Sequence, residues 1–314
     1  MGSLQNTGVI VPGRRVLIFS VRYRCVSFLF RTGGPPAMRD TGAPMRSTLT
    51  LFSLALALAA GPAQAASVYL EDMTWTEVRD ALRAGSTTVI IPVGGTEQNG
   101  PHMALGKHNL RAHALAGKVA AALGNALVAP VLSYVPEGRI APPGGHMRYP
   151  GTISISDEAF KGVLDGAARS FRQHGFRDIV WLGDSGNYQS LIAEVATKLN
   201  REWAAAAGTA TPARAHWISE YYRTGQTAYV QALRDKGLSD AQIGTHAGAA
   251  DTSLLMAVAP NALRPDRLAP DTDGVAGDPR AASAALGQIG VDLIVARSVA
   301  AIRSAVNAHA ANRR

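Results

Sequence analysis

The chain has 314 residues, a formal net charge of +8 and a single cysteine. Residues 1–65 hold seven arginines and one acidic residue, so the remainder of the chain carries a net charge of only about +2. The basic character therefore does not indicate nucleic-acid binding, and no cluster of basic and aromatic residues follows residue 66. Because Cys25 also lies in that first segment, residues 66–314 can form neither a disulfide nor a cysteine-ligated metal site.

The segment up to residue 65 has the organisation of a secretory leader. Met45-Arg46 provides a basic start, residues 49–60 form an apolar stretch, and Ala63-Gln64-Ala65 has the small-residue spacing of a cleavage site. About twelve apolar residues are fewer than the roughly 20 that a membrane-spanning helix needs. We therefore expect a signal peptide cleaved after Ala65. The mature protein would then be periplasmic or secreted, with no stable insertion in the membrane.

The expected organisation is a leader over residues 1–65 and one α/β domain over residues 66–314. Residues 1–37 match no part of a signal peptide, which leaves the start of translation open. Three methionines are alternative start sites: Met1, Met38 and Met45.

Residues 66–314 alternate between the apolar patterns of helices and strands. Thr74 and Glu77 form a capping box that opens a helix, and Ser156 caps a later helix that begins with two acids. The Gly- and Pro-rich segment 134–151 is predicted to be a long functional loop. The expected helices cover residues 74–84, 110–123, 157–174, 188–206 and 251–258, and the expected strands cover residues 88–93, 126–132, 179–182 and 216–219. Repeated β–α units predict a three-layer α/β sandwich with a mostly parallel central sheet.

The segment 92–102, Pro-Val-Gly-Gly-Thr-Glu-Gln-Asn-Gly-Pro-His, directly follows the first expected strand. In open α/β sheets, ligands bind at the carboxyl ends of the strands. Glu97, His102 and His108 place one carboxylate and two imidazoles there, a set of ligands that suits zinc or manganese. The alternative interpretation of the same spacing is a turn whose polar side chains only form hydrogen bonds.

Five segments in this order resemble motifs of the creatininase family of metal-dependent hydrolases. Segment 92–102 resembles the first metal motif, and segments 149–154, 174–180, 246–253 and 274–279 resemble the later ones. The resemblance covers about residues 70–300. It implies the creatininase fold, hydrolysis of a carbon–nitrogen bond in a small amide or cyclic amide, and assembly into a homo-oligomer.

The resemblance also shows where this chain departs from the family pattern. Family members hold two metal ions with a Glu and a His of the first motif, a bridging Asp, and a later His and Glu. Glu97 matches the first Glu, whereas the other four positions hold different residues: Asn99, His108, Ser185 and Asn187. Neutral amides are poor ligands for zinc-like ions, but an imidazole can still bind one ion. We therefore expect a single zinc or manganese ion bound by Glu97, His108 and Asp184.

The remaining motif residues are assigned roles by the resemblance. His246 matches the family histidine that transfers protons, with a hydrogen-bonded structural histidine as the alternative. Asp251 matches the Glu that follows and is expected to orient the site. Three residues are expected to lie near the substrate: His102, His146 and Asn99. The histidines of regular elements are expected to be surface or packing residues: His113, His174 and His216.

Two other functions remain open from the sequence. Residues 183–187, Gly-Asp-Ser-Gly-Asn, lie between a strand and a helix like a nucleophile elbow, which would make Ser185 the nucleophile of a serine hydrolase. His246 could be its base, but no acid is placed convincingly between them. The four changed ligand positions are instead compatible with a periplasmic binding protein that kept the fold and lost the chemistry.

Overall fold

The structure is a computed structural model that describes residues 67–207, 212–270 and 272–311. The expected leader and its alternative start sites lie outside these residues. Among the described residues, helix α10 (Ala284–Ala311) has the length and composition of a membrane span. It packs against α3 (Lys107–Leu123), α6 (Ser219–Gln226) and α9 (Ala249–Val258). Because its residues Val291, Ile294 and Ile302 are buried, it is a core helix of this domain.

Among the described residues, four parallel strands form the central sheet in the order β2-β1-β3-β4. They are β1 (Thr88–Val93), β2 (Ala126–Val128), β3 (Asp178–Gly183) and β4 (Arg214–Trp217). Parallel neighbours require a crossover connection, usually a helix, which accounts for the β–α alternation of the sequence. Strand β2 ends earlier than expected because Pro130 has no N–H, and Leu132 then rejoins β1 as an isolated bridge to Val93.

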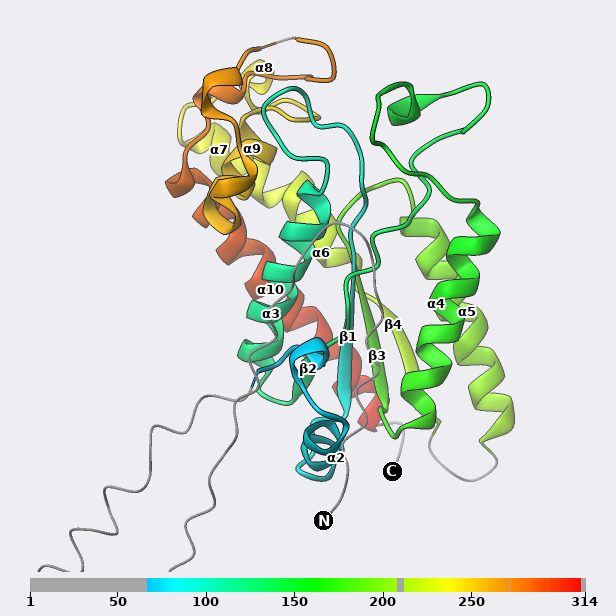
Figure 1. Ribbon diagram of the computed structural model, residues 1–314. Helices are drawn as coiled ribbons and strands as arrows, with labels where there is room; N and C mark the ends of the chain where they lie inside the picture. The colour runs from blue at the N-terminus through cyan, green and yellow to red at the C-terminus, as the bar shows by residue number, and fades with distance from the viewer. Residues whose placement is uncertain (1–66, 208–211, 271, 312–314) are drawn as a thin grey trace, which may run out of the picture. The chain divides into compact units, whose positions relative to one another are not determined.

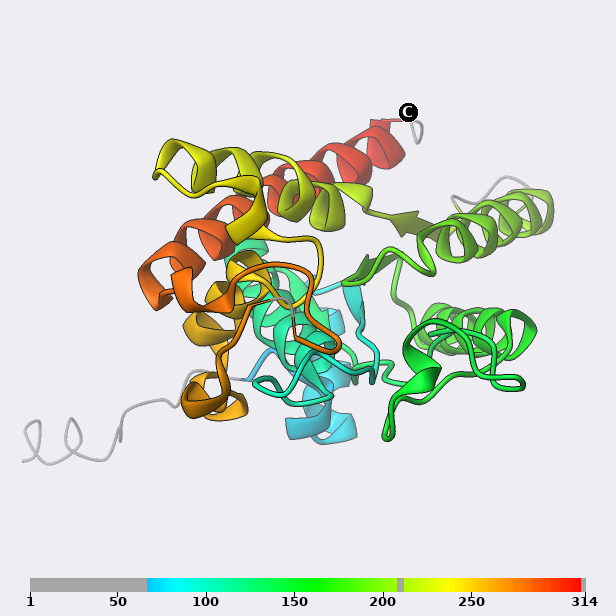
Figure 2. The same ribbon diagram turned by 90° about the horizontal axis from the view of Figure 1, so that it is seen from above.

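Helices cover both faces of this sheet, as Figures 1 and 2 show. Side chains alternate between faces along a strand, so Ile179 and Trp181 pack against α4 (Asp157–Gln173) and α5 (Gln189–Ala206). Val180 and Leu182 point to the opposite face. The helices on that side are α3 (Lys107–Leu123), α6 (Ser219–Gln226), α7 (Ala228–Asp235), α9 (Ala249–Val258) and α10. The three-layer α/β sandwich with a parallel sheet is thus confirmed.

The predicted helix starts agree with the structure where a cap defines them. Thr74 and Glu77 form the expected capping box of α2 (Trp75–Arg83), and the Ser156 side chain accepts from the Ala159 N–H at the start of α4. In the part of the chain that the structure describes, the other short helices are α8 (Asp240–Ile243) and five 3-10 turns, namely Leu70–Asp72, Gly145–Arg148, Pro260–Ala262, Pro265–Arg267 and Pro279–Ala281.

Helix α3 begins at Lys107, three residues before the predicted start. Its first turn places Lys107, His108 and Arg111 beside the carboxyl end of β1, where all three are buried. The loop after β1 and the loop 134–151 lie at the same end of the sheet, which is uppermost in Figure 1. This edge carries the candidate active site.

Candidate active site

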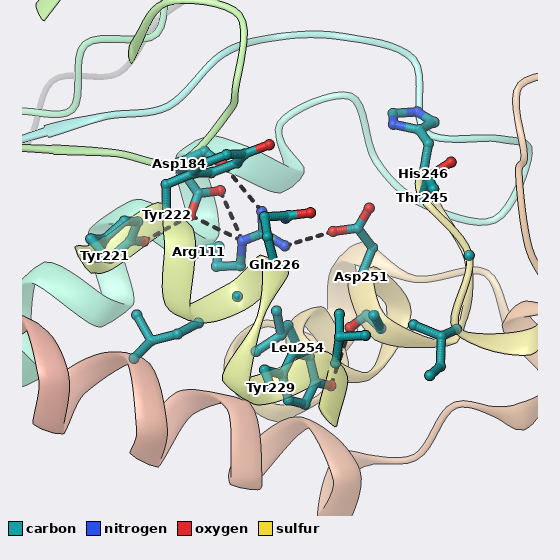
Figure 3. A pocket seen from close by; sticks show the side chains of 16 residues that line it. Arg111, Asp184, Tyr221, Tyr222, Gln226, Tyr229, Thr245, His246, Asp251 and Leu254 are labelled. Carbon is teal, nitrogen blue, oxygen red and sulfur yellow. Dashed lines mark hydrogen bonds and ion pairs between the residues drawn. The ribbon is translucent and has the colours of Figure 1, made fainter. Parts of the chain in front are cut away.

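A polar cavity lies at the carboxyl edge of the sheet, where the segments after β1 and β3 meet the loop before α9. Its wall includes residues that are far apart in the chain: Glu97, Lys107, His146, Asp184, Tyr222 and His246. An adjoining pocket extends between α6 and α9 and shares Arg111, Asp184 and Asp251 with it. Figure 3 shows Arg111 between the two aspartates.

His108 lies between two carboxylates and donates to both of them. Its Nε2 atom is 2.8 Å from Glu97 Oε1, and its Nδ1 atom is 2.7 Å from Asp184 Oδ2. Burial and the charge of Lys107 lower the pKa of His108, but the hydrogen bonds to Asp184 and Glu97 outweigh them and raise it overall. The ring is therefore an imidazolium that bridges two carboxylates.

This bridge corrects the predicted ligand set of Glu97, His108 and Asp184. Glu97 and Asp184 contact different nitrogens of the His108 ring, so the three residues do not converge on one point. Asp184 also accepts from Arg111 Nε at 2.8 and 3.0 Å and from the Tyr221 hydroxyl at 2.7 Å. Both of its oxygens are thus occupied by donors of the chain.

Lys107 is a buried cation that the sequence-based reasoning missed. Its side chain is 1% exposed, and its Nζ atom lies 3.2 Å from Asp251 Oδ2 and 3.8 Å from Glu97 Oε1. Arg111 Nη1 donates to the other oxygen of Asp251 at 2.8 Å. Lys107, Arg111 and charged His108 therefore balance three carboxylates: Glu97, Asp184 and Asp251.

A different group of residues fits a metal ion. The ligand atoms of Glu97, His146 and His246 all lie within 4.8 Å of one another. Glu97 Oε2 is buried without a hydrogen bond among the described residues, and His146 Nε2 lies 3.3 Å from it. One carboxylate and two imidazoles are ligands that suit zinc or manganese, so these residues fit a single ion.

The protonation of the two imidazoles agrees with that fit. Burial lowers the pKa of His146, and burial with the nearby Lys107 lowers the pKa of His246 to about 4. Both rings are therefore neutral near pH 7, and only a neutral imidazole has a lone pair for a metal. Gln98 contacts both rings: its Nε2 atom lies 3.0 Å from His146 Nδ1 and 3.1 Å from His246 Nε2, and it donates to whichever of these nitrogens carries no proton.

Glu137, from the long loop 134–151, is a second residue that the sequence-based reasoning missed. Burial and the neighbouring charge of Glu97 raise its pKa to about 8, so its carboxyl is mostly protonated at pH 7. Asn187, at the position of a family metal ligand, donates to Glu137 Oε2 at 2.8 Å. The only signal for Glu137 in the sequence was its place in a loop already predicted to be functional.

The structure corrects the expected substrate contacts of His102 and Asn99. Both side chains are fully buried and do not line the cavity. His102 Nε2 bonds to the Thr252 hydroxyl at 3.1 Å, and Asn99 Nδ2 donates to the backbone carbonyl of Glu97 at 2.8 Å. They hold the loop that carries Glu97. His146, in contrast, lines the cavity.

Ser185 lines the cavity, but within the described part of the chain its hydroxyl has no hydrogen bond to a histidine. Its hydroxyl oxygen accepts a hydrogen bond from the Asn187 N–H at 3.5 Å. The His246 Nε2 atom lies instead 3.0 Å from the backbone carbonyl of Gln98. The geometry therefore lacks the serine–histidine pair of a nucleophile elbow. Asp251 accepts from the Ala247 N–H at 3.0 Å and so orients the loop that carries His246.

The family model for creatinine amidohydrolase matches residues 71–302. The chain belongs to the creatininase family. The creatinine amidohydrolase of Pseudomonas putida is 29% identical over 206 residues, which cover 64% of this chain and 76% of the relative. The mycofactocin precursor peptide peptidase of Mycolicibacterium smegmatis is 36% identical over 113 residues, which cover 34% of this chain and 43% of that protein.

Solved creatininase structures confirm the same family and fold. A manganese form is 25% identical with a TM-score of 0.63, over 76% of this chain and 98% of that chain. A zinc-zinc form of a creatininase mutant is 25% identical with a TM-score of 0.62, with the same coverage. The expectation of a creatininase-family amidohydrolase enzyme is confirmed, and the chain has residue groups able to hold the kind of metal its relatives contain.

Proposed function

We propose that this member of the family is a single-ion hydrolase of a carbon–nitrogen bond in a small amide or cyclic amide. The observation that carries the proposal is that the ligand atoms of Glu97, His146 and His246 all lie within 4.8 Å of one another, and that among the described residues Glu97 Oε2 is buried without a hydrogen bond. A zinc or manganese ion bound there would lower the pKa of a bound water and polarise a carbonyl group.

One ion fits the donor set better than the two of the family pattern. The second family position would need the side chains at 99 and 187, and these are amides that bond to the backbone and to Glu137. The buried charge of Lys107, 3.8 Å from Glu97, also limits how much cationic charge can be held near Glu97. The chain therefore replaces part of the metal charge with its own ammonium and guanidinium groups.

The cavity wall supports a small polar substrate. Lys107 Nζ has one hydrogen bond, to Asp251, and lines the cavity, so it can donate to a carbonyl oxygen on which negative charge develops. The hydroxyls of Ser185 and Tyr222 line the same cavity and offer further hydrogen bonds. Such donors bind an amide by its polar atoms and stabilise the transition state more than the ground state.

His246 has two competing roles, ligand or proton carrier. Its Nδ1 atom faces Glu97 Oε1 at 3.9 Å, while its Nε2 atom contacts the Gln98 carbonyl. The neutral ring can either bind an ion through Nδ1 or take a proton from water and pass it to the departing nitrogen. The ligand role uses the observed convergence, and the proton-transfer role is the one that the family resemblance implies.

Metal analysis of the purified full chain tests the proposal. We expect Glu97→Gln and His146→Gln each to lose one metal equivalent relative to the wild type, together with hydrolysis of a panel of small amides and lactams. His113→Gln is the matched control, because His113 stacks on Tyr69 away from the cavity. His246→Gln loses the same equivalent if His246 is a ligand, and keeps it but loses activity if His246 carries the proton.

The alternatives give different results in the same experiment. If the wild type and Glu97→Gln contain equal amounts of metal after incubation with zinc or manganese, the single-ion hydrolase is refuted. Retained binding of a small amide would then favour the periplasmic binding protein. Covalent labelling of Ser185 by a fluorophosphonate would favour the serine hydrolase.

We also propose export and assembly on the grounds given by the sequence. The apolar stretch and the Ala63-Gln64-Ala65 site support cleavage after Ala65 and a periplasmic or secreted domain of residues 66–314. The family resemblance supports a homo-oligomer. Mass spectrometry of the N-terminus from cells and light scattering of the purified protein test these two points. A retained leader refutes the first, and a monomer refutes the second.

A further inference from the structure

A second buried cluster lies at the opposite end of the sheet from the cavity. Asp178 is the first residue of β3, His216 lies in β4, and His309 lies near the end of α10. Their exposed fractions are 2, 8 and 5% respectively. His216, expected to be a surface or packing residue, is therefore buried and makes a polar contact. Asp178 lies six residues before Asp184, and because β3 joins them, this spacing is roughly 20 Å of extended chain.

Both imidazoles approach the same carboxylate oxygen. His216 Nε2 lies 2.8 Å from Asp178 Oδ1, and His309 Nδ1 lies 3.1 Å from it. The three ligand atoms all lie within 4.8 Å of one another. Strand pairing explains the arrangement, because Val180 is opposite His216, so the side chains of Asp178 and His216 point to the α10 face.

The second nitrogen of His309 determines which atom is free to bind. His309 Nε2 donates to the backbone carbonyl of Pro212 at 3.0 Å, so in the neutral ring the lone pair is on Nδ1. That lone pair then faces the Asp178 carboxylate at 3.1 Å, which is repulsive unless a cation lies between them or the ring is protonated. A histidine that donates one N–H to a carbonyl and presents its other nitrogen is typical of metal ligands.

We propose that Asp178, His216 and His309 bind one divalent metal ion, of which zinc fits best. One carboxylate oxygen and two imidazole nitrogens suit this ion, and water can fill a fourth position. The three residues come from separate elements, with Asp178 and His309 131 positions apart in the chain. The ion would hold the end of α10 against the start of β3 and β4, so its role is structural. In Figure 1 this end of α10 lies at the lower edge of the sheet.

The experiment separates this site from the cavity by using four forms of the full chain. They are the wild type, His309→Gln, the double variant Glu97→Ala with His146→Ala, and the triple variant. We expect His309→Gln to lose one zinc equivalent that the double variant keeps, and the triple variant to bind none. If the cavity binds no metal but this cluster does, the wild type and the double variant each contain one zinc equivalent.

Thermal unfolding provides a readout independent of activity. A chelator should lower the Tm of the double variant by several degrees and leave the Tm of the triple variant unchanged. Cobalt added to the chelated double variant should give the visible absorption of a nitrogen- and oxygen-ligated ion, a measurement that does not require any His309 variant to fold. A double variant that binds neither zinc nor cobalt would show that the cluster is a hydrogen-bonded triad with a protonated imidazole, and the proposal would fail.

Discussion

Arg111 donates from its Nε atom to both carboxylate oxygens of Asp184, at 2.8 and 3.0 Å, and both side chains are buried. The same guanidinium reaches Asp251 through Nη1, as Figure 3 shows. One cation from α3 thus neutralises a carboxylate after β3 and another in α9. The first turn of α3 is in this way tied to two other elements of the site.

Removal of Arg111 should destabilise the domain strongly. Arg111→Met removes the guanidinium that neutralises Asp184 and Asp251 inside the domain. We therefore expect the free energy of unfolding to fall by about 3–5 kcal/mol. Arg111→Lys is the matched control, because it keeps the charge but lacks the planar fork that reaches both acids, and should cost less. Urea unfolding at pH 7 measures both variants. Equal stability of Arg111→Met and the wild type would show that these ion pairs do not support the fold.

Removal of the Lys107 charge should strengthen metal binding in the cavity. Its ammonium lies 3.8 Å from Glu97 Oε1, so it competes with any cation that Glu97 would bind. We expect Lys107→Met to tighten zinc binding at Glu97 by about tenfold or more. The control is Lys118→Met, an exposed residue of the same helix. Competition with a coloured chelator measures the affinities, and unchanged binding in Lys107→Met would contradict the expected repulsion.

The stability of the domain should fall in acid because of Asp251. Burial alone would raise the pKa of Asp251, but Lys107 and Arg111 hold it well below its ordinary value of 3.8. The unfolded chain therefore takes up this proton at a higher pH than the folded chain. The stabilisation is complete above the unfolded pKa and is lost as the pH falls below about 4 towards the folded value.

The test compares unfolding free energies of the wild type and Asp251→Asn between pH 7 and pH 3. We expect the variant to be less stable at pH 7 and to show a shallower decline below pH 4, since it lacks the titrating group. Parallel curves for the two proteins would mean that other carboxyls cause the acid sensitivity.

The capping box of α2 gives a prediction remote from the cavity. The Glu77 N–H donates to the Thr74 hydroxyl, and the Thr74 N–H donates to the Glu77 carboxylate at 2.6 Å. Thr74→Ala removes one of these bonds and should cost about 1 kcal/mol, whereas Thr74→Ser keeps the oxygen and should cost much less. Thermal unfolding of the three proteins checks the order. A Thr74→Ser variant as unstable as Thr74→Ala would show that the methyl group matters rather than the cap.

The structure brings several of the predicted site residues together at one cavity and adds others that were not predicted. Glu97, Asp184 and His246 were placed correctly at the edge of the sheet, because each follows or precedes a recognisable element or motif. The predicted start of α3 was too late, since helix periodicity follows apolar residues and its first turn is polar. Lys107 and Arg111 are buried by ionic contacts rather than by apolar packing, and a hydrophobic pattern cannot reveal that.

The amino-acid sequence by itself determined the family, the parallel α/β architecture and the edge of the sheet where the candidate active site lies. These properties depend on local periodicity, caps and short motifs, which are readable without knowledge of distant contacts. Only the tertiary structure decided that His108 bridges two acids and that His146 joins Glu97 and His246. Such partnerships join residues far apart in the chain, and they depend on how loops pack on one another and how buried charges find their counterions.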